Sequence, residues 1–188
     1  MSDSQMEDQK LIDEFVGVCH GDFERVKALL AAHPSLLHGS ASWRETGIEA
    51  AAQIGRVDIV EFLLRAGAPL DICTAAMLRR KDQVAAFLLT DPGLSQARGA
   101  HGLPVMYYPA IRGDQEIAAL LLGKGAEINA GAGGNTALHG AVLFGQVAMV
   151  RWLLEHGADP ALMDYNGKTA LELARENNQG AIVELLIT

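Results

Sequence analysis

The sequence predicts an all-α fold, a solenoid in which antiparallel helix pairs stack in a row and short β-hairpin-like loops join them. Three observations predict it: a repeated spacing of glycine, threonine and leucine, apolar residues at helical spacing within each repeat, and a low aromatic content. Hydrophobic residues make up 49% of the 188 residues, whereas aromatic residues make up only 5%. Small aliphatic side chains must therefore fill most of the core, which suits thin helices that pack closely.

The repeat is clearest over residues 131–163. Three positions there recur 33 residues later: Gly134, Thr136 and Leu138 correspond to Gly167, Thr169 and Leu171. Two glycines of the same stretch have counterparts 32 residues earlier: Gly145 corresponds to Gly113, and Gly157 to Gly125. A period of this size is the sequence signature of a stacked repeat array.

Residues 134–139 read Gly-Asn-Thr-Ala-Leu-His. They resemble the Gly-x-Thr-Pro-Leu-His signature of the ankyrin repeat and differ from it by alanine in place of proline. The resemblance covers about residues 11–188 and implies units made of a turn and two helices. It also implies a curved stack, with the first helices and hairpin tips on the concave side, where proteins of this kind contact their partners.

We expect a polar N-terminal tail over residues 1–10, either frayed or forming the first turn of a helix, and a single ankyrin-repeat domain over residues 11–188. The six units are predicted at about 11–41, 42–70, 71–98, 99–130, 131–163 and 164–188. The first and last units act as caps, because each has a neighbour on one side only. The unit at 71–98 is short, since the Leu-Leu pair at 63–64 recurs after only 25 residues, against about 33 for a full unit. This predicts a notch in the row of hairpins.

Apolar residues at helical spacing predict the helices of each unit. The second-helix runs cover, in chain order, residues 23–32, 59–64, 83–89, 117–122, 150–155 and 182–186. A first helix and a turn precede each run, and alanines such as Ala50 and Ala51 keep the first helices thin. Pro109 falls within the first helix of the fourth unit. It is tolerated near the first turn, because the amide that proline lacks has no intrahelical acceptor there.

Thr136 and His139 are interpreted as structural residues. A threonine at a helix start can accept a hydrogen bond from a backbone amide as an N-cap. The imidazole three residues later can form hydrogen bonds within the turn and with the neighbouring unit.

Charge and the N-terminal sequence narrow the choice of partner and compartment. The net charge of −8 disfavours binding to nucleic acid and to anionic lipid surfaces, because proteins bind both through clustered Lys and Arg. Residues 1–10 lack the basic and apolar regions of a secretory signal, and no apolar run approaches the roughly 20 residues that cross a bilayer. We therefore expect a cytoplasmic protein with no nucleic-acid or membrane partner, and a monomer.

The sequence predicts no catalytic residue, no metal site and no cofactor. None of the six histidines has a His or Cys partner at ligand spacing, and Cys19 lies 54 positions before Cys73. The glycine-rich stretch at 131–135 lacks the Lys-Ser/Thr of a phosphate-binding loop. Gly-x-Ser-x-Gly is absent, so no nucleophile elbow indicates hydrolase chemistry.

The candidate partner-binding residues lie at hairpin tips and at the exposed ends of first helices. They are Trp43, Gln53, Ile54, Leu78, Arg79, His101, Ile111, Arg112, Asn135, Leu143, Phe144, Tyr165 and Lys168. Leu103 occupies a comparable position. Aromatic and arginine side chains dominate the binding energy of many interfaces. The competing interpretation is that several apolar members pack between units, and Leu103 and Leu143 are the best candidates for this.

These residues predict a non-catalytic protein–protein interaction module that binds a protein partner through its concave face. One alternative is a small-molecule binder or enzyme with a site near Tyr107, Tyr108 and Arg112, with His101 beside it; a deep pocket with convergent polar groups would favour it. The other alternative is a structural protein that self-associates.

Overall fold

The computed structural model describes residues 3–131 and 133–187, and within them the chain is helical. The helix pairs are α1 (Asp3–Val18) with α2 (Phe23–Ala32), α3 (Gly47–Gln53) with α4 (Val57–Arg65), α5 (Ile72–Met77) with α6 (Lys81–Thr90), α7 (Tyr107–Ile111) with α8 (Gln115–Gly123), α9 (Ala137–Leu143) with α10 (Val147–Glu155), and α11 (Ala170–Glu176) with α12 (Gly180–Leu186). Three short 3-10 helices join them, η1 (Pro34–His38), η2 (Pro92–Gln96) and η3 (Ala100–Gly102). The predicted all-α solenoid is confirmed.

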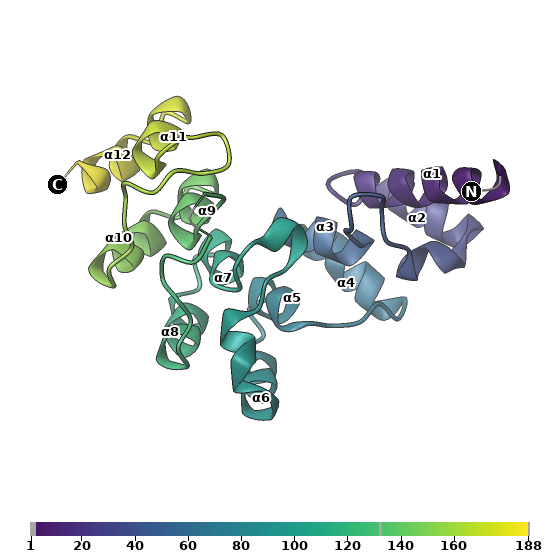
Figure 1. The fold of residues 1–188 in the computed structure, drawn as a ribbon, viewed down its shortest axis with the longest axis horizontal. Helices are drawn as coiled ribbons and strands as arrows, with labels where there is room; N and C mark the ends of the chain where they lie inside the picture. The colour runs from purple at the N-terminus through teal and green to yellow at the C-terminus, as the bar shows by residue number, and fades with distance from the viewer. Residues whose placement is uncertain (1–2, 132, 188) are drawn as a thin grey trace.

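The pairs follow one another along an arc, with the two chain ends at opposite ends of the molecule (Figure 1). The first helices α3, α7 and α9 lie towards the inner side of the arc, and α6 and α8 stand on its outer side. Hairpin-like loops occur where isolated antiparallel bridges form, at Ser40–Thr46, Arg98–Pro104 and Met163–Thr169. Within 3–131 and 133–187, we find no helix with the length and apolar character that crossing a membrane requires.

Helix α1 begins at Asp3, which corrects the predicted tail over residues 1–10. Residues 3–10 contain no glycine or proline and are rich in good helix formers, so they extend the first helix although they lack apolar periodicity. Gln9 donates to the carboxylate of Asp13 one turn later (2.9 Å) and to the carbonyl of Ser40 (3.2 Å). These bonds tie the start of the helix to the first hairpin. Residues 1 and 2 lie outside the described part of the chain.

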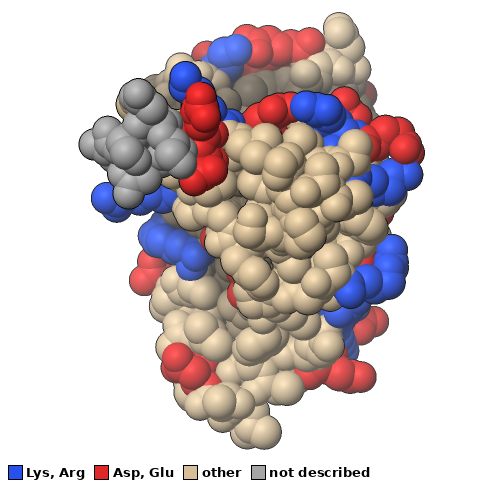
Figure 2. All heavy atoms as spheres, turned by 90° about the vertical axis from the view of Figure 1, so that its right-hand side faces the viewer, with Lys and Arg blue, Asp and Glu red and all other residues tan. Residues whose placement is uncertain are grey.

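The end of the stack that carries α1 and α2 has a largely uncharged face (Figure 2). Lys, Arg, Asp and Glu side chains lie around the edges of this face rather than at its centre. An ion pair between Arg25 and Glu14 links the two helices. Charge on the N-terminal cap is therefore concentrated at its margin.

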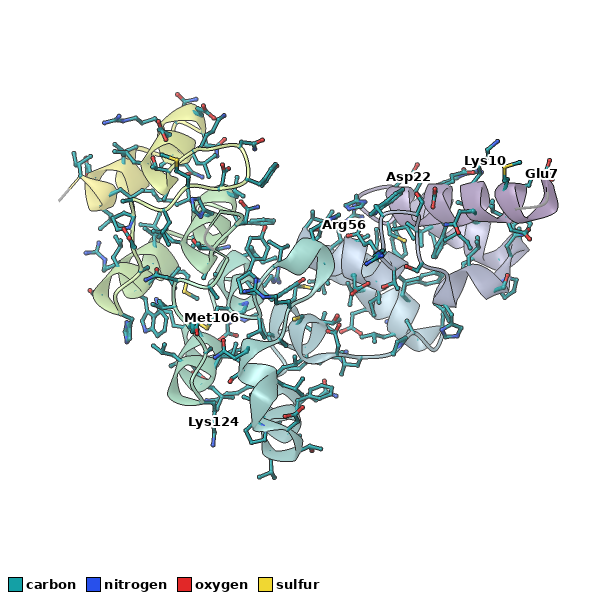
Figure 3. The ribbon with its side chains drawn as sticks, viewed as in Figure 1. Glu7, Lys10, Asp22, Arg56, Met106 and Lys124 are labelled. Carbon is teal, nitrogen blue, oxygen red and sulfur yellow. The ribbon has the colours of Figure 1, made fainter. Side chains whose placement is uncertain are left out.

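Polar side chains link the turn of each unit to the turn before it. In the last two units, the residue that precedes the second helix donates to a carbonyl near the end of the first helix of the preceding unit: Gln146 to Ile111 (3.0 Å) and Gln179 to Val142 (2.7 Å). Arg56, at the start of α4, reaches the Gly21 carbonyl in the same way (Figure 3). Between the third and fourth units the direction is reversed, with Arg79 pairing to Asp114 at 3.0 Å.

The third unit lacks a hairpin, and the fourth unit occupies part of the space. Residues 66–71 join α4 to α5 without a bridge, so no loop projects there. The η3 loop of the fourth unit instead contacts α3 of the second unit. His101, in this loop, has a φ of 52°, in the left-handed region that non-glycine residues rarely adopt. The notch is therefore bridged by a bent loop.

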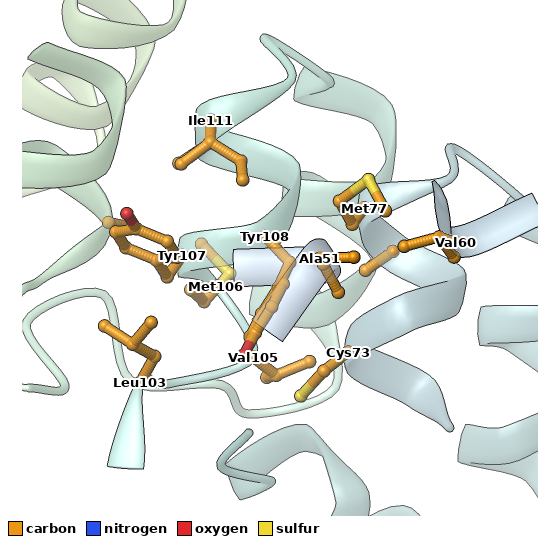
Figure 4. Packing of buried hydrophobic residues seen from close by; sticks show 14 of the residues in the cluster. Ala51, Val60, Cys73, Met77, Leu103, Val105, Met106, Tyr107, Tyr108 and Ile111 are labelled. Carbon is orange, nitrogen blue, oxygen red and sulfur yellow. The ribbon is translucent and has the colours of Figure 1, made fainter. Parts of the chain in front are cut away.

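Tyr108 fills the core behind this loop (Figure 4). It is 1% exposed and lies among buried side chains that include Met106, Cys73 and Met77. Its hydroxyl packs against the backbone of Gly99, where an added Cβ would lie 2.1 Å from the oxygen. Its ring lies beside α5 of the shortened unit, which α7 contacts.

Gly140 allows α7 and α9 to approach closely. It lies inside α9, and a Cβ there would be 2.7 Å from Cε2 of Tyr107 and 3.1 Å from Cγ2 of Ile111. Both neighbours are buried side chains of α7. Glycine inside a helix is unfavourable by itself, so this glycine is explained by the space that it leaves for α7.

We predict opposite outcomes for two Gly→Ala substitutions in helices. Gly140→Ala should destabilise the protein by about 1–3 kcal/mol through overpacking. Gly123→Ala is the control: Gly123 ends α8 and has no atom within 4 Å of the added Cβ, so stability should be kept or rise by up to about 1 kcal/mol. Urea unfolding followed by circular dichroism measures both. Equal effects of the two substitutions would contradict this account of Gly140.

His139 belongs to a capping box at the start of α9 and is 1% exposed. The backbone amide of Thr136 donates to its Nδ1 (3.2 Å), so that nitrogen must carry no proton. Burial lowers the pKa of His139, and the charge of Asp164 with the backbone of Lys168 and Leu162 opposes this only in part. The structural interpretation of His139 therefore fits the structure.

The lowered pKa of His139 predicts a loss of stability in mild acid. The folded state binds this proton less readily than the unfolded chain, where the pKa is about 6.5, so the free energy of unfolding should fall as the pH drops below that value. Measured between pH 7 and 5, the fall should be shallower for His139→Asn than for the wild type. His33→Asn is the matched control for the same substitution at an exposed histidine.

Candidate binding groove

A cavity of about 620 Å³ lies on the inner side of the arc, and we call it the central groove. Its lining residues are Gln53, Ile54, His101, Leu103, Tyr107, Gly134, Asn135, Leu143, Phe144 and Tyr165. They come from the second, fourth, fifth and sixth units. The third unit contributes none of them, as expected where a hairpin is missing.

Phe144 forms one side of the groove. It follows α9, and its Cε1 lies 3.6 Å from the position of a Cβ added to Gly55, in the turn after α3. The ring thus reaches from the fifth unit to the second. Because Phe144 is still 38% exposed and Leu143 beside it 40%, the groove keeps an open apolar wall.

A buried carboxylate lies behind the groove at Glu45, which is 1% exposed. One of its oxygens, Oε1, accepts a hydrogen bond from Gln53 Nε2 (2.6 Å), and the other, Oε2, accepts one from Trp43 Nε1 (2.7 Å). Two imidazoles approach the same group: His101 Nε2 lies 3.5 Å from Oε1, and His20 Nε2 lies 3.7 Å from Oε2. Glu45 therefore links the first, second and fourth units.

The charge of Glu45 has no fixed cationic partner. Among the described residues, no Lys or Arg nitrogen lies within 4.0 Å of its carboxylate; only the two histidines do. Its negative charge also acts on Cys19, whose pKa burial and then Glu45 raise to about 12. Gln53 and His101 separate this carboxylate from the groove, since both line the groove and both approach Oε1.

The groove brings together many of the residues predicted as partner contacts. These are Gln53, Ile54, His101, Asn135, Leu143, Phe144 and Tyr165. Of the two leucines considered for packing, Leu103 is 8% exposed, whereas Leu143 stays 40% exposed. Leu103 therefore packs between units, whereas Leu143 remains open to solvent.

One predicted contact residue is enclosed by the core. Ile111 is 1% exposed, because the close approach of α9 to α7 at Gly140 covers its side chain, so it offers no open contact. Leu78, at the end of α5, is partly buried against the core and stays a proposed contact.

The remaining predicted contacts lie outside the lining of the groove. Trp43 is 42% exposed, although its indole nitrogen is held by Glu45. Arg79 pairs with Asp114, and Lys168 pairs with Glu176 at 2.6 Å. Arg112 packs its Cδ 3.9 Å from the Cβ position at Gly55.

Comparison with known proteins decides the family. The family described as "Ankyrin repeats (3 copies)" matches residues 15–164 and 132–188. The chain belongs to the ankyrin-repeat family. Ankyrin repeats are in general protein–protein interaction modules, and the family is typically non-catalytic.

Individual relatives agree with this assignment. A Treponema pallidum protein named as ankyrin repeat-containing is 28% identical over 182 residues, which is 96% of this chain and 53% of the relative. The ankyrin repeat protein YahD of Escherichia coli is 60% identical over 42 residues, 22% of this chain and 21% of the relative. This ankyrin-repeat chain thus spans about half the length of the first relative and a fifth of the second.

The alternative site near the two tyrosines borders the central groove of the ankyrin stack, which Tyr107 and His101 both line. Tyr108 is enclosed, and Tyr107 is 4% exposed and borders the central groove. Burial is the first cause that raises the pKa of Tyr107 to about 12 and that of Tyr108 well above its usual value. Neither hydroxyl therefore has a pKa that suits proton transfer near neutral pH. Among the residues the structure describes, no group of three His, Cys, Asp or Glu side chains can hold a metal ion.

Glu45 was missed by the sequence analysis, although its position carried a signal. It immediately precedes the capping threonine of its unit, Thr46, as Asn135 precedes Thr136. The equivalent position in the last unit is Lys168. Because Asn135 and Lys168 were both predicted as contacts, alignment of the ankyrin units would have added Glu45.

We predict that Glu45→Ala destabilises the protein by about 1–3 kcal/mol, because the part-buried donors of Trp43 and Gln53 lose the buried carboxylate that accepts from them. Glu116→Ala is the control. Glu116 pairs with Lys81 at the surface and its side chain is 77% exposed, so its loss should change the urea midpoint little. Midpoints that shift equally in the two variants would show that the Glu45 network contributes no more than a surface pair.

Proposed function

We propose that this chain is a non-catalytic module that binds a protein partner through the central groove on its concave face. One observation carries the proposal: exposed apolar side chains converge on this groove from separate units, with Tyr165 70% exposed beside Leu143 and Phe144. Its volume falls within the range of ligand pockets, roughly 300–1,000 Å³. A few side chains of a partner segment would fill it.

The stacked architecture supports this proposal energetically. Gln53, Tyr107 and Leu143 belong to helices, and the capping box of α9 and hydrogen bonds between turns hold neighbouring loop segments. A site that is ordered before contact loses little conformational entropy on binding. Aromatic side chains at its centre suit the role of energetic hot spots.

The wider proposal covers partners, compartment and assembly. Trp43, Leu78, Arg79, Arg112 and Lys168 are proposed as contacts outside the groove. We propose a monomer in the cytoplasm that needs no cofactor and binds neither nucleic acid nor membranes. The two buried, unpaired cysteines suit a reducing compartment. The net charge of −8 opposes binding to nucleic acid and to anionic membranes.

A small-molecule ligand is the second candidate, because the volume of the groove is also of the size that small ligands occupy. Self-association is the third. Light scattering over a concentration series tests it, since a stable oligomer would exceed the mass of a single chain at every concentration.

Site-specific photo-crosslinking in the native host tests the proposed function. A photoreactive benzophenone amino acid replaces Tyr165 in one variant and Leu89 in another; Leu89, on α6, is 87% exposed and lies outside the groove. We expect a defined protein adduct from position 165 that is absent from position 89 and is abolished by Leu143→Asp. Adducts of the same pattern from both positions, or none from position 165, would contradict binding through the groove.

A further inference from the structure

Two acceptors lie at or behind the groove, Glu45 without a Lys or Arg partner and Asn135 Oδ1 without a donor, and one nearby donor, Arg112 Nε, is also buried with no hydrogen-bond partner among the described residues. Glu45 lies directly behind Gln53 and His101 with a charge that no fixed cation neutralises. Asn135 lines the groove, and its Oδ1 is buried and accepts no hydrogen bond from the described residues. Buried acceptors left in this state cost free energy until a donor satisfies them. The groove is therefore prepared for a ligand that brings donors and positive charge.

The rest of the lining is apolar. Ile54, Leu143 and Phe144 form a wall that favours a bulky apolar side chain over water. Arg112 packs near Gly55 but is not a lining residue. An occupant that combines an apolar anchor with an adjacent cation would satisfy both parts of the groove.

We infer that the central groove selects a partner segment in which a lysine or arginine stands next to a bulky apolar residue. This inference rests on the proposed function and specifies its ligand. The apolar side chain enters between Leu143, Phe144 and Ile54, and the cationic group is attracted by the field of Glu45 and can donate to Asn135 Oδ1. The overall charge of −8 favours the approach of such a segment over long range.

Three matched peptides test the inference on the intact chain. They are N-acetyl-Gly-Phe-Lys-Gly-amide and its analogues with Gln or Glu in place of Lys. Dissociation constants come from ¹H–¹⁵N NMR titrations that follow the amides of groove residues such as Tyr165 and Phe144. We expect the Lys peptide to bind about fivefold or more tightly than the Glu peptide. This ratio should shrink in 0.5 M NaCl because salt screens partly exposed charges.

Two variants assign the selectivity to its source. Glu45→Gln keeps the size of the side chain and removes its charge, so the Lys-to-Glu ratio of affinities should shrink markedly, leaving only the part due to the overall charge, while the Gln peptide binds as before. Asn135→Asp adds charge at the lining and should widen the Lys-to-Glu ratio. The second variant keeps the test decisive if the first fails to fold, which proton spectra reveal.

The outcomes separate this inference from the proposed function. If the Lys and Glu peptides shift the groove amides with equal affinity in the wild type, the charge selectivity is wrong and the groove remains a binding site. If none of the three peptides shifts these amides, both proposals fail. If phenethylamine binds as tightly as the Lys peptide, the ligand is a small cation and the peptide assignment is overturned.

Discussion

The structure depends on contact between neighbouring helix pairs, because no single pair can bury enough apolar surface to be stable alone. The contact between α7 and α9 shows how tightly this is arranged. Because Gly140 has no side chain, Tyr107 and Ile111 can lie against the backbone of α9. Alanines such as Ala50 and Ala75 are fully buried and also let neighbouring helices pack closely, although less closely than at Gly140. Side-chain size at first-helix positions therefore sets the spacing of the stack.

The missing hairpin of the third unit explains the position of the groove. Where residues 66–71 leave a gap, the η3 loop bends across to α3, and His101 comes within reach of Glu45. Phe144 approaches the turn at Gly55 from the other side. A regular array would hold these units further apart. The groove is thus a product of an irregularity in the repeat, whereas the regular parts supply its rigid frame.

Much of the fold could be predicted because the repeat signature is local. The stretch at 134–139 and its counterpart one period later located the best-preserved units, and apolar spacing located the second helices. The predicted start of the first helix was wrong, because polar residues can extend a helix without showing apolar periodicity in the sequence. Groove residues such as Asn135 and Phe144 were predicted from their register in the unit.

The remaining errors concern contacts between distant parts of the chain. Burial of Ile111 depends on a glycine in the next unit, and the role of Glu45 depends on histidines in two other units. Neither contact is encoded within one repeat. Sequence spacing gives the direction in which a side chain leaves its helix, but the identity of its neighbour follows from how closely the units approach.

Three of the hydrogen bonds between turns share a direction along the chain, whereas the Arg79–Asp114 pair runs the other way. Arg56, Gln146 and Gln179 each donate to a carbonyl of the unit that comes before them. During translation, each of these donors leaves the ribosome after its acceptor, so a new helix pair meets a finished surface that already offers the matching oxygen. The stack is therefore suited to growth by addition at its C-terminal edge, one pair at a time, as the polypeptide emerges.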